Sequence, residues 1–173
     1  MRHFFLLSAV LAGTFFLPSH AQQGPTDAQI AHIVVTANQV DIEAGQLAEK
    51  MASSKEVRDF GKQMVTDHTA VNKQAAALAS KLKLKPEDNP TSASLKKGGL
   101  DKMSELKKLK GDAFDKAYVK NEVDYHQAVI DAVDKTLLPS AKNAELKSLI
   151  EKVRPALVQH LEHARHLQAQ LAK

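Results

Sequence analysis

The sequence predicts an all-α protein, an antiparallel four-helix bundle with a long crossover that contains a short extra helix. Apolar residues recur at alternating steps of three and four in four segments of about 25 residues, the spacing of one helix face. Only 7 of 173 residues are Gly and 6 are Pro, and residue types that favour helices dominate. Short turns between paired segments favour a bundle within one chain over a coiled coil between chains.

The first two helices are predicted to form a hairpin. Thr26 opens the first with a capping box, because Gln29 follows three residues later, and residues 53–56 open the second in the same way. The apolar face of the first comprises Ile33, Ala37, Val40, Ala44, Leu47 and Met51, and that of the second Val57, Gly61, Met64, His68, Val71, Ala75, Leu78 and Leu82. Because only two or three residues separate the helices, they must run antiparallel.

Residues 84–111 are predicted to form the crossover. Pro86 and Pro90 interrupt the helical pattern, and Gly98 and Gly99 follow. Leucines and Met103 between residues 95 and 109 indicate a short amphipathic helix rich in Lys. Its lysines could bind an anionic surface, but a solvated face is the simpler interpretation.

The third and fourth helices are predicted to form a second hairpin. The third extends from about residue 112 to about residue 137, and the fourth starts at about Asn143. Pro155 lies inside the fourth and should kink it or mark a restart, since proline lacks a backbone donor. Two hairpins joined by one long crossover have the connectivity of ferritin-like folds.

The N-terminus has the pattern of a cleavable export signal. Arg2 precedes an apolar run from residue 4 to residue 17, and Ser19 and Ala21 supply small residues for cleavage after Ala21. The run is shorter than the ~20 residues of a membrane-spanning helix. We therefore expect a signal peptide over 1–21, one domain over 22–173 without a transmembrane segment, and a periplasmic or envelope-associated location.

Composition excludes several classes of function. The chain has no Cys, so neither disulfides nor thiolate metal sites are available. A net charge of +4, 5% aromatic residues and no Trp disfavour a nucleic-acid partner. No nucleophile or phosphate-loop pattern stands out, so an enzyme is the least favoured class.

Three histidines fall at the centre of apolar stripes, each on a different predicted helix. Buried imidazoles must find hydrogen-bond partners or bind a ligand, because an unpaired buried polar group is costly. Met64 and Glu122 lie on the same stripes, and Glu43 lies at the boundary of its own. The candidate metal ligands are therefore His68, His126, His160, Met64, Glu122 and Glu43.

The predicted register limits how many of these can meet. Counted from the turns, Glu43 is level with Met64, whereas Glu122 matches His160 better than His126 does, with a mismatch on the order of 9 Å for the latter. A single site with all six is not expected, but three or four could converge. A polar network of His with Asp67, Asp115 or a tyrosine would need no metal at all.

Three segments carry a resemblance to a known family: residues 57–69 with the string Met-Val-Thr-Asp-His-Thr, residues 114–118 with His126, and residues 160–164. The chain resembles the exported bacterial family called domain of unknown function 4142, which is grouped with ferritin-like proteins and whose members are often labelled outer-membrane proteins. The resemblance implies a ferritin-like bundle and brings no established activity.

A comparison with ferritins indicates which metal the candidate residues suit and which function to expect. Di-iron proteins of the fold use Glu-x-x-His on two helices, a motif that does not occur in this sequence. Met and His ligands suit Cu or Zn better than Fe. We thus expect a non-catalytic exported protein that binds a transition metal; the alternative is an envelope interaction or stress protein whose core histidines are purely structural.

Overall fold

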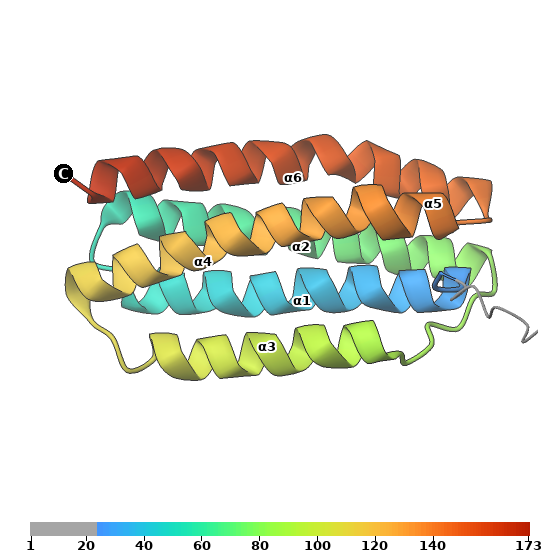
Figure 1. Cartoon of the computed structure of the whole chain (residues 1–173), viewed down its shortest axis with the longest axis horizontal. Helices are drawn as coiled ribbons and strands as arrows, with labels where there is room; N and C mark the ends of the chain where they lie inside the picture. The colour runs from blue at the N-terminus through green and yellow to red at the C-terminus, as the bar shows by residue number, and fades with distance from the viewer. Residues whose placement is uncertain (1–23) are drawn as a thin grey trace, which may run out of the picture.

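The computed structural model describes residues 24–173, and within that range every regular element is helical (Figure 1). The elements are α1 (Asp27–Met51), α2 (Lys55–Lys81), α3 (Pro90–Leu106), α4 (Gly111–Ala132), the π-helix η1 (Val133–Leu137), α5 (Leu138–Ser140) and α6 (Ala144–Leu171). The predicted all-α class is confirmed. The predicted signal peptide and its cleavage site after Ala21 lie outside the described residues.

The long helices α1, α2, α4 and α6 enclose a common interior, and α3 packs on the outer side of α1 (Figure 1). Two apolar clusters fill this interior. The first surrounds Phe60, Phe114 and Tyr118, and the second surrounds Ile130, Ile150 and others towards the opposite ends of the helices. Between the two clusters lies a layer of buried polar side chains, which is described below.

The connection between α1 and α2 is short, as predicted, and is held from outside the hairpin. Asp115 on α4 accepts hydrogen bonds from the backbone N–H groups of Ser53 and Ser54, at 3.0 and 2.7 Å, and from the Ser53 hydroxyl at 2.6 Å. These donors belong to the N-terminal end of α2, where a carboxylate is stabilising. Asp115 therefore fixes this turn rather than serving as a histidine partner.

The crossover helix α3 is longer than the short helix predicted, because Asn89 caps it and Pro90 occupies its first position. It lies so close to α1 that a Cβ on Gly99 would come within 2.8 Å of Val40 Cγ1. Lysines on its outer side are exposed and pair locally, as Lys97 does with Asp101. These pairs agree with a solvated face.

The third helix ends close to the predicted position at about residue 137. The chain continues through the π-turn and α5 to Ser140 before it turns back. In a regular helix the ring of Pro139 would clash with the carbonyl four residues earlier, and a wider turn relieves that clash. The fourth helix starts after Asn143 as predicted and continues through Pro155 without a restart. Pro155 is exposed, so water can donate a hydrogen bond to the backbone carbonyl that the proline leaves without a donor.

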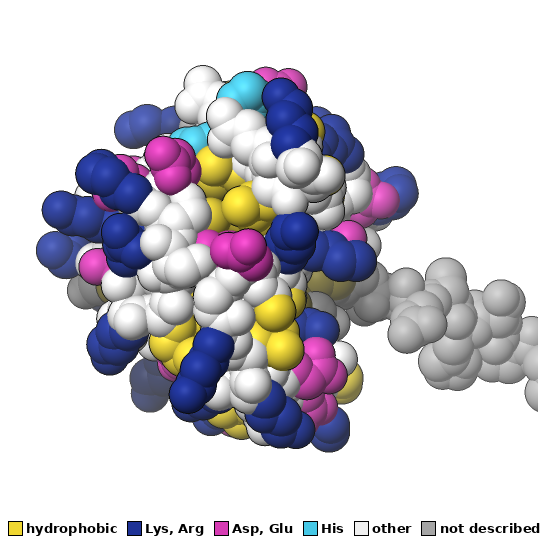
Figure 2. All heavy atoms as spheres, turned by 90° about the vertical axis from the view of Figure 1, so that its left-hand side faces the viewer, with side chains coloured by type: hydrophobic (Ala, Val, Ile, Leu, Met, Phe, Trp, Pro, Cys, Tyr) yellow, Lys and Arg dark blue, Asp and Glu magenta, His cyan; other side chains and the backbone are white. Residues whose placement is uncertain are grey.

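The end of the molecule that carries the C-terminus is rimmed by charge. Figure 2 shows Lys and Arg side chains around this end, with hydrophobic side chains visible between them. Of the described helices, none combines the length and apolarity needed to cross a bilayer.

Candidate metal centre

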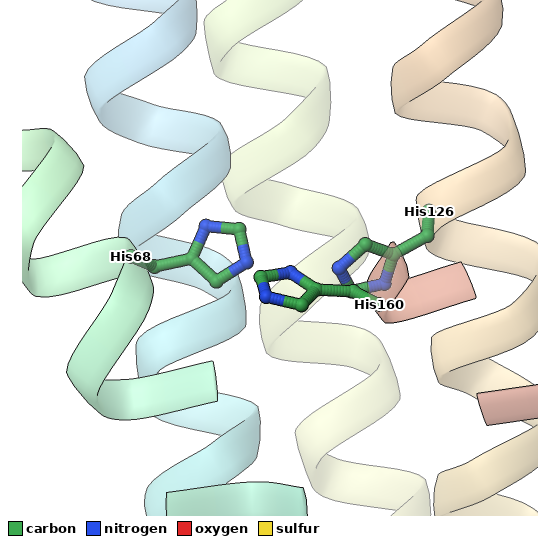
Figure 3. Close-up of side chains that lie close together, drawn as sticks. All are labelled: His68, His126 and His160. Carbon is green, nitrogen blue, oxygen red and sulfur yellow. The ribbon is translucent and has the colours of Figure 1, made fainter. Parts of the chain in front are cut away.

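The three predicted histidines meet in the polar layer. His68 comes from α2, His126 from α4 and His160 from α6, and their side chains point towards one another (Figure 3). The ring centroids are 5.3 to 5.7 Å apart, and each residue is at most 4% exposed. One nitrogen from each ring lies within 4.8 Å of the other two. The predicted burial of all three is thus confirmed.

The protein determines which nitrogen of His68 carries its hydrogen. The backbone carbonyl of Val35 can only accept, so Asn72 must donate to it through Nδ2. Asn72 Oδ1 then accepts from Asn38 Nδ2 at 2.9 Å, which leaves Asn38 Oδ1 to accept from His68 Nδ1 at 2.7 Å. His68 therefore donates through Nδ1 and presents its Nε2 to the interior.

The other two rings are oriented in the same manner. His126 Nδ1 donates to the backbone carbonyl of Glu122 at 3.0 Å, and His160 Nε2 donates to the carboxylate of Asp67 at 3.0 Å. Asp67 itself is 42% exposed, so this contact connects the site to the surface. The remaining ring nitrogens are His68 Nε2, His126 Nε2 and His160 Nδ1, and none of these three has a hydrogen-bond partner within residues 24–173.

Asp41 on α1 adds a carboxylate to this group. Its Oδ2 lies 2.7 Å from His68 Nε2 and 3.4 Å from His126 Nε2, but neither approach has the direction of a hydrogen bond. Burial alone would raise the pKa of this carboxyl, yet the adjacent His68 and then His126 lower the pKa below its usual value. Asp41 therefore places a carboxyl group directly beside the facing nitrogens of two of the rings.

Glu122 lies on the far side of His126, with Oε2 3.5 Å from His126 Nδ1. Asp41, Glu122 and His126 form a second group whose donor atoms lie within 4.8 Å of one another. Burial, and then the charge of Asp41, raise the pKa of Glu122 well above its usual value. Glu122 therefore ionises less readily than an ordinary glutamate.

Burial also keeps the imidazoles neutral. It lowers the pKa of His126 to about 4, although the nearby Asp41 acts in the opposite direction. Burial lowers the pKa of His160 as well, against the opposing effect of Asp67. Neutral imidazole is the form that binds a metal ion, so at neutral pH these two rings are ready to act as ligands.

The other predicted ligands lie elsewhere. Met64 is fully buried, but it packs in the apolar cluster with Phe60 and Tyr118. Glu43 is half-buried at the boundary of α1, where Gln39 donates to it at 3.0 Å. The structure therefore brings together His68, His126 and His160, and it places Glu122 in the second group, with His126 and Asp41.

The predicted register was wrong for His126, which meets His160 with a ring-centroid distance of 5.4 Å. The count assumed that the third helix ends at residue 137. The 3 residues of α5 extend it, and this shifts the register by about 4.5 Å at 1.5 Å per residue, which removes about half of the predicted mismatch.

Asp41 and Asn38 were missed because they lie outside the apolar stripe of the first helix. That stripe included Val40, which is only half-buried because it faces α3, whereas Asn38 and Asp41 face the interior. A helix covered on two sides has a wider buried face than its apolar residues mark out. The missed signal was a pair of polar residues three apart, the spacing of one helix face.

Comparison with known proteins identifies one family. Residues 16–167 match the family described as "Domain of unknown function (DUF4142)", which confirms the resemblance inferred from the sequence motifs. No curated protein and no solved structure matches the chain.

Proposed function

The chain belongs to the DUF4142 family, and we propose that it binds a divalent transition-metal ion through His68, His126, His160 and Asp41. The role is binding or buffering of the ion rather than catalysis. The observation that carries this proposal is the set of three imidazole lone pairs that converge without hydrogen-bond partners among the described residues.

A structural network alone would not require this arrangement. Each buried polar atom left unpaired costs about 1–3 kcal/mol, so three such nitrogens around one point oppose folding. In metal sites, by contrast, a ligating histidine almost always donates its other N–H to a carboxylate or a carbonyl. The contacts from the three rings to Asn38, Glu122 and Asp67 have this form.

The donor atoms need a modest contraction to bind an ion. Bonds of about 2.0–2.1 Å to nitrogen imply donor separations of about 3.4 Å around a tetrahedral ion. The facing nitrogens of the three rings already lie within 4.8 Å of one another. A bound cation would also offset the charge of Asp41, which now faces two imidazoles without hydrogen-bond geometry.

The donor set favours Zn²⁺ or Cu²⁺. Imidazole suits both ions, and affinity for such sites rises towards Cu²⁺ in the first transition row. Iron is less favoured, because the chain has no Glu-x-x-His motif. Met64 lies in the apolar cluster, so the proposal does not use a thioether ligand.

The proposed setting is the periplasm or cell envelope, and the proposed architecture is a ferritin-like antiparallel four-helix bundle of α1, α2, α4 and α6. The short α1–α2 connection and the long crossover through α3 support the architecture. The small-residue cleavage pattern at Ser19 and Ala21 supports export of the mature chain from Gln22.

Metal titration of the untagged mature chain, residues 22–173, tests the proposal. We expect one Zn²⁺ or Cu²⁺ per chain by calorimetry, and stabilisation by about 2.7 kcal/mol at a free ion concentration one hundred times Kd. His68→Leu replaces the ring with an apolar side chain of similar volume. It should remove the stabilisation by metal, and its melting temperature without metal should equal or exceed that of the wild type. His166→Ala, at an exposed position on α6, is the control and should behave as wild type. Wild-type melts that are identical with and without both ions would refute metal binding.

A further inference from the structure

A cavity of about 300 Å³ adjoins the three imidazoles. Its polar wall consists of Asn38, Asp41, Asp67, His68, His126 and His160. The rest of its lining is mainly aliphatic and includes Ile33, Val34, Val71, Val129, Ile150 and Leu157. Thr91 and Thr136 also line it and are exposed, so the cavity reaches the surface.

This combination is typical of a small-molecule site rather than of a packing defect. Ligand sites are mostly apolar hollows of about 300–1,000 Å³ with a few convergent polar groups. Here the convergent groups are the three unpaired ring nitrogens beside Asp41. The irregular helix η1 contributes Val133 and Leu137 to the lining, and such π-turns occur frequently at functional sites.

The shape limits the occupant to a short amphiphile. A volume at the lower end of the range for ligand pockets favours a short chain over a long one. The aliphatic walls favour a hydrocarbon body, since each buried methylene adds to affinity. The polar head must then lie against the imidazoles and Asp41.

Charge determines the chemistry of that head. The polar wall consists of ring nitrogens that have no hydrogen-bond partner among the described residues, together with the carboxyl group of Asp41, and these groups disfavour an anion while no metal is bound. With a divalent ion bound by three neutral imidazoles and one carboxylate, the group carries one positive charge. We propose that the cavity binds a short aliphatic carboxylate, whose hydrocarbon chain fills the apolar part while its carboxylate adds a fifth ligand to the ion. This inference rests on the metal binding proposed above.

Octanoate binding to the mature chain tests the proposal, with Zn²⁺ binding measured first and separately. For Zn²⁺-loaded protein we expect an octanoate Kd at least about tenfold lower than for protein treated with a chelator. Butanoate should bind more weakly than octanoate, by about fourfold for each methylene removed. Octylamine serves as the control of opposite charge. It should not bind Zn²⁺-loaded protein more tightly than metal-free protein, because its cationic head would face the ion.

Val129→Phe supplies a variant that retains the metal ligands. Val129 lines the cavity, so a larger side chain there should weaken octanoate binding and leave Zn²⁺ binding unchanged. The matched control is Val158→Phe on α6, at a position that packs against the same apolar cluster but does not line the cavity. Circular dichroism melts establish that both variants are folded.

The outcomes separate the two proposals. Absence of both Zn²⁺ and Cu²⁺ binding refutes the metal centre. Zn²⁺ binding without octanoate binding, or octanoate binding that is equal with and without metal, refutes the carboxylate site and leaves the metal centre intact. An effect of Val158→Phe as large as that of Val129→Phe would also overturn the assignment of the cavity.

Discussion

At the scale of single residues, the protein retains polar groups in its interior that oppose folding. Besides the three ring nitrogens, both oxygens of Asp41, Glu122 Oε2 and the Tyr118 hydroxyl are buried without hydrogen-bond partners in the described part of the chain. Such groups cost free energy, and natural proteins keep costly polar groups at sites that need them for function. The polar layer is therefore where stability and function conflict.

The pH dependence of stability follows from the neutral state of His126. Burial lowers the pKa of His126 from 6.5 to about 4. As pH falls through 6.5, the unfolded chain gains a proton that the folded chain does not. The contribution of His126 to the free energy of unfolding is thus fully present above about pH 6.5. It declines by on the order of 3 kcal/mol as the pH falls to about 4.

Comparison of wild type with His126→Leu isolates this effect. The quantity to compare is the unfolding free energy of the wild type minus that of the variant. In metal-free buffer, this value should become smaller by about 2 kcal/mol when the pH is lowered from 7 to 5. Glu122 acts with the opposite sign, because its raised pKa favours the folded state at low pH, but it is present in both proteins. Urea titrations at each pH measure the difference. Parallel stability curves would mean that His126 is solvated.

At the scale of elements, two glycines control how closely α1 and α2 approach. A Cβ on Gly61 would lie 2.8 Å from the Gly45 carbonyl oxygen and 2.9 Å from the Cβ of Ala48. Backbone and Cβ atoms cannot swing aside as a long side chain can. The crossing of these helices therefore depends on the absence of side chains at both positions.

Gly61→Ala and Gly98→Ala form a matched pair. Gly61→Ala should destabilise the protein by about 1–3 kcal/mol, because the helices must separate. Gly98 lies inside α3 with no atom within 4 Å of an added Cβ, so Gly98→Ala should stabilise by about 0.5–1 kcal/mol through helix propensity alone. Thermal or urea unfolding measures both. Equal effects of the two substitutions would contradict the close crossing.

At the scale of the whole molecule, the apolar clusters above and below the polar layer hold the ligands in place. The α1–α2 turn is anchored by Asp115, and at the opposite end Asp27 accepts hydrogen bonds from the backbone N–H groups of Lys142 and Asn143, at 2.9 and 3.0 Å. Both anchors join segments distant in the sequence. They fix the relative register of the helices, and the geometry of the three histidines depends on that register.

Export is a property of the whole chain and can be checked directly. If the signal pattern acts as proposed, the main cellular species should begin at Gln22 and occur in the soluble envelope fraction. Ala21→Phe should block this processing, because the position needs a small residue, whereas a substitution at Gln23 should not. Mass spectrometry of the cellular protein decides, and a dominant species that begins at Met1 would contradict export.

The sequence by itself determined the features that depend on neighbouring residues. Apolar periodicity and capping residues such as Thr26 and Asn143 located the helices, since these signals act within a turn or two of the chain. The same periodicity predicted the burial of His68, His126 and His160, because each lies at the centre of its stripe.

Tertiary structure decided which of the buried groups meet. Asp41 is a ligand candidate only because α3 covers one side of α1 and leaves Asp41 on the other. His126 meets His160 although the predicted register separated them, and Met64 packs among aromatic rings instead. The spacing of apolar residues indicates which face of a helix is buried. Which residues of different helices meet depends also on the axial register of the helices and on the number of neighbours that each helix has.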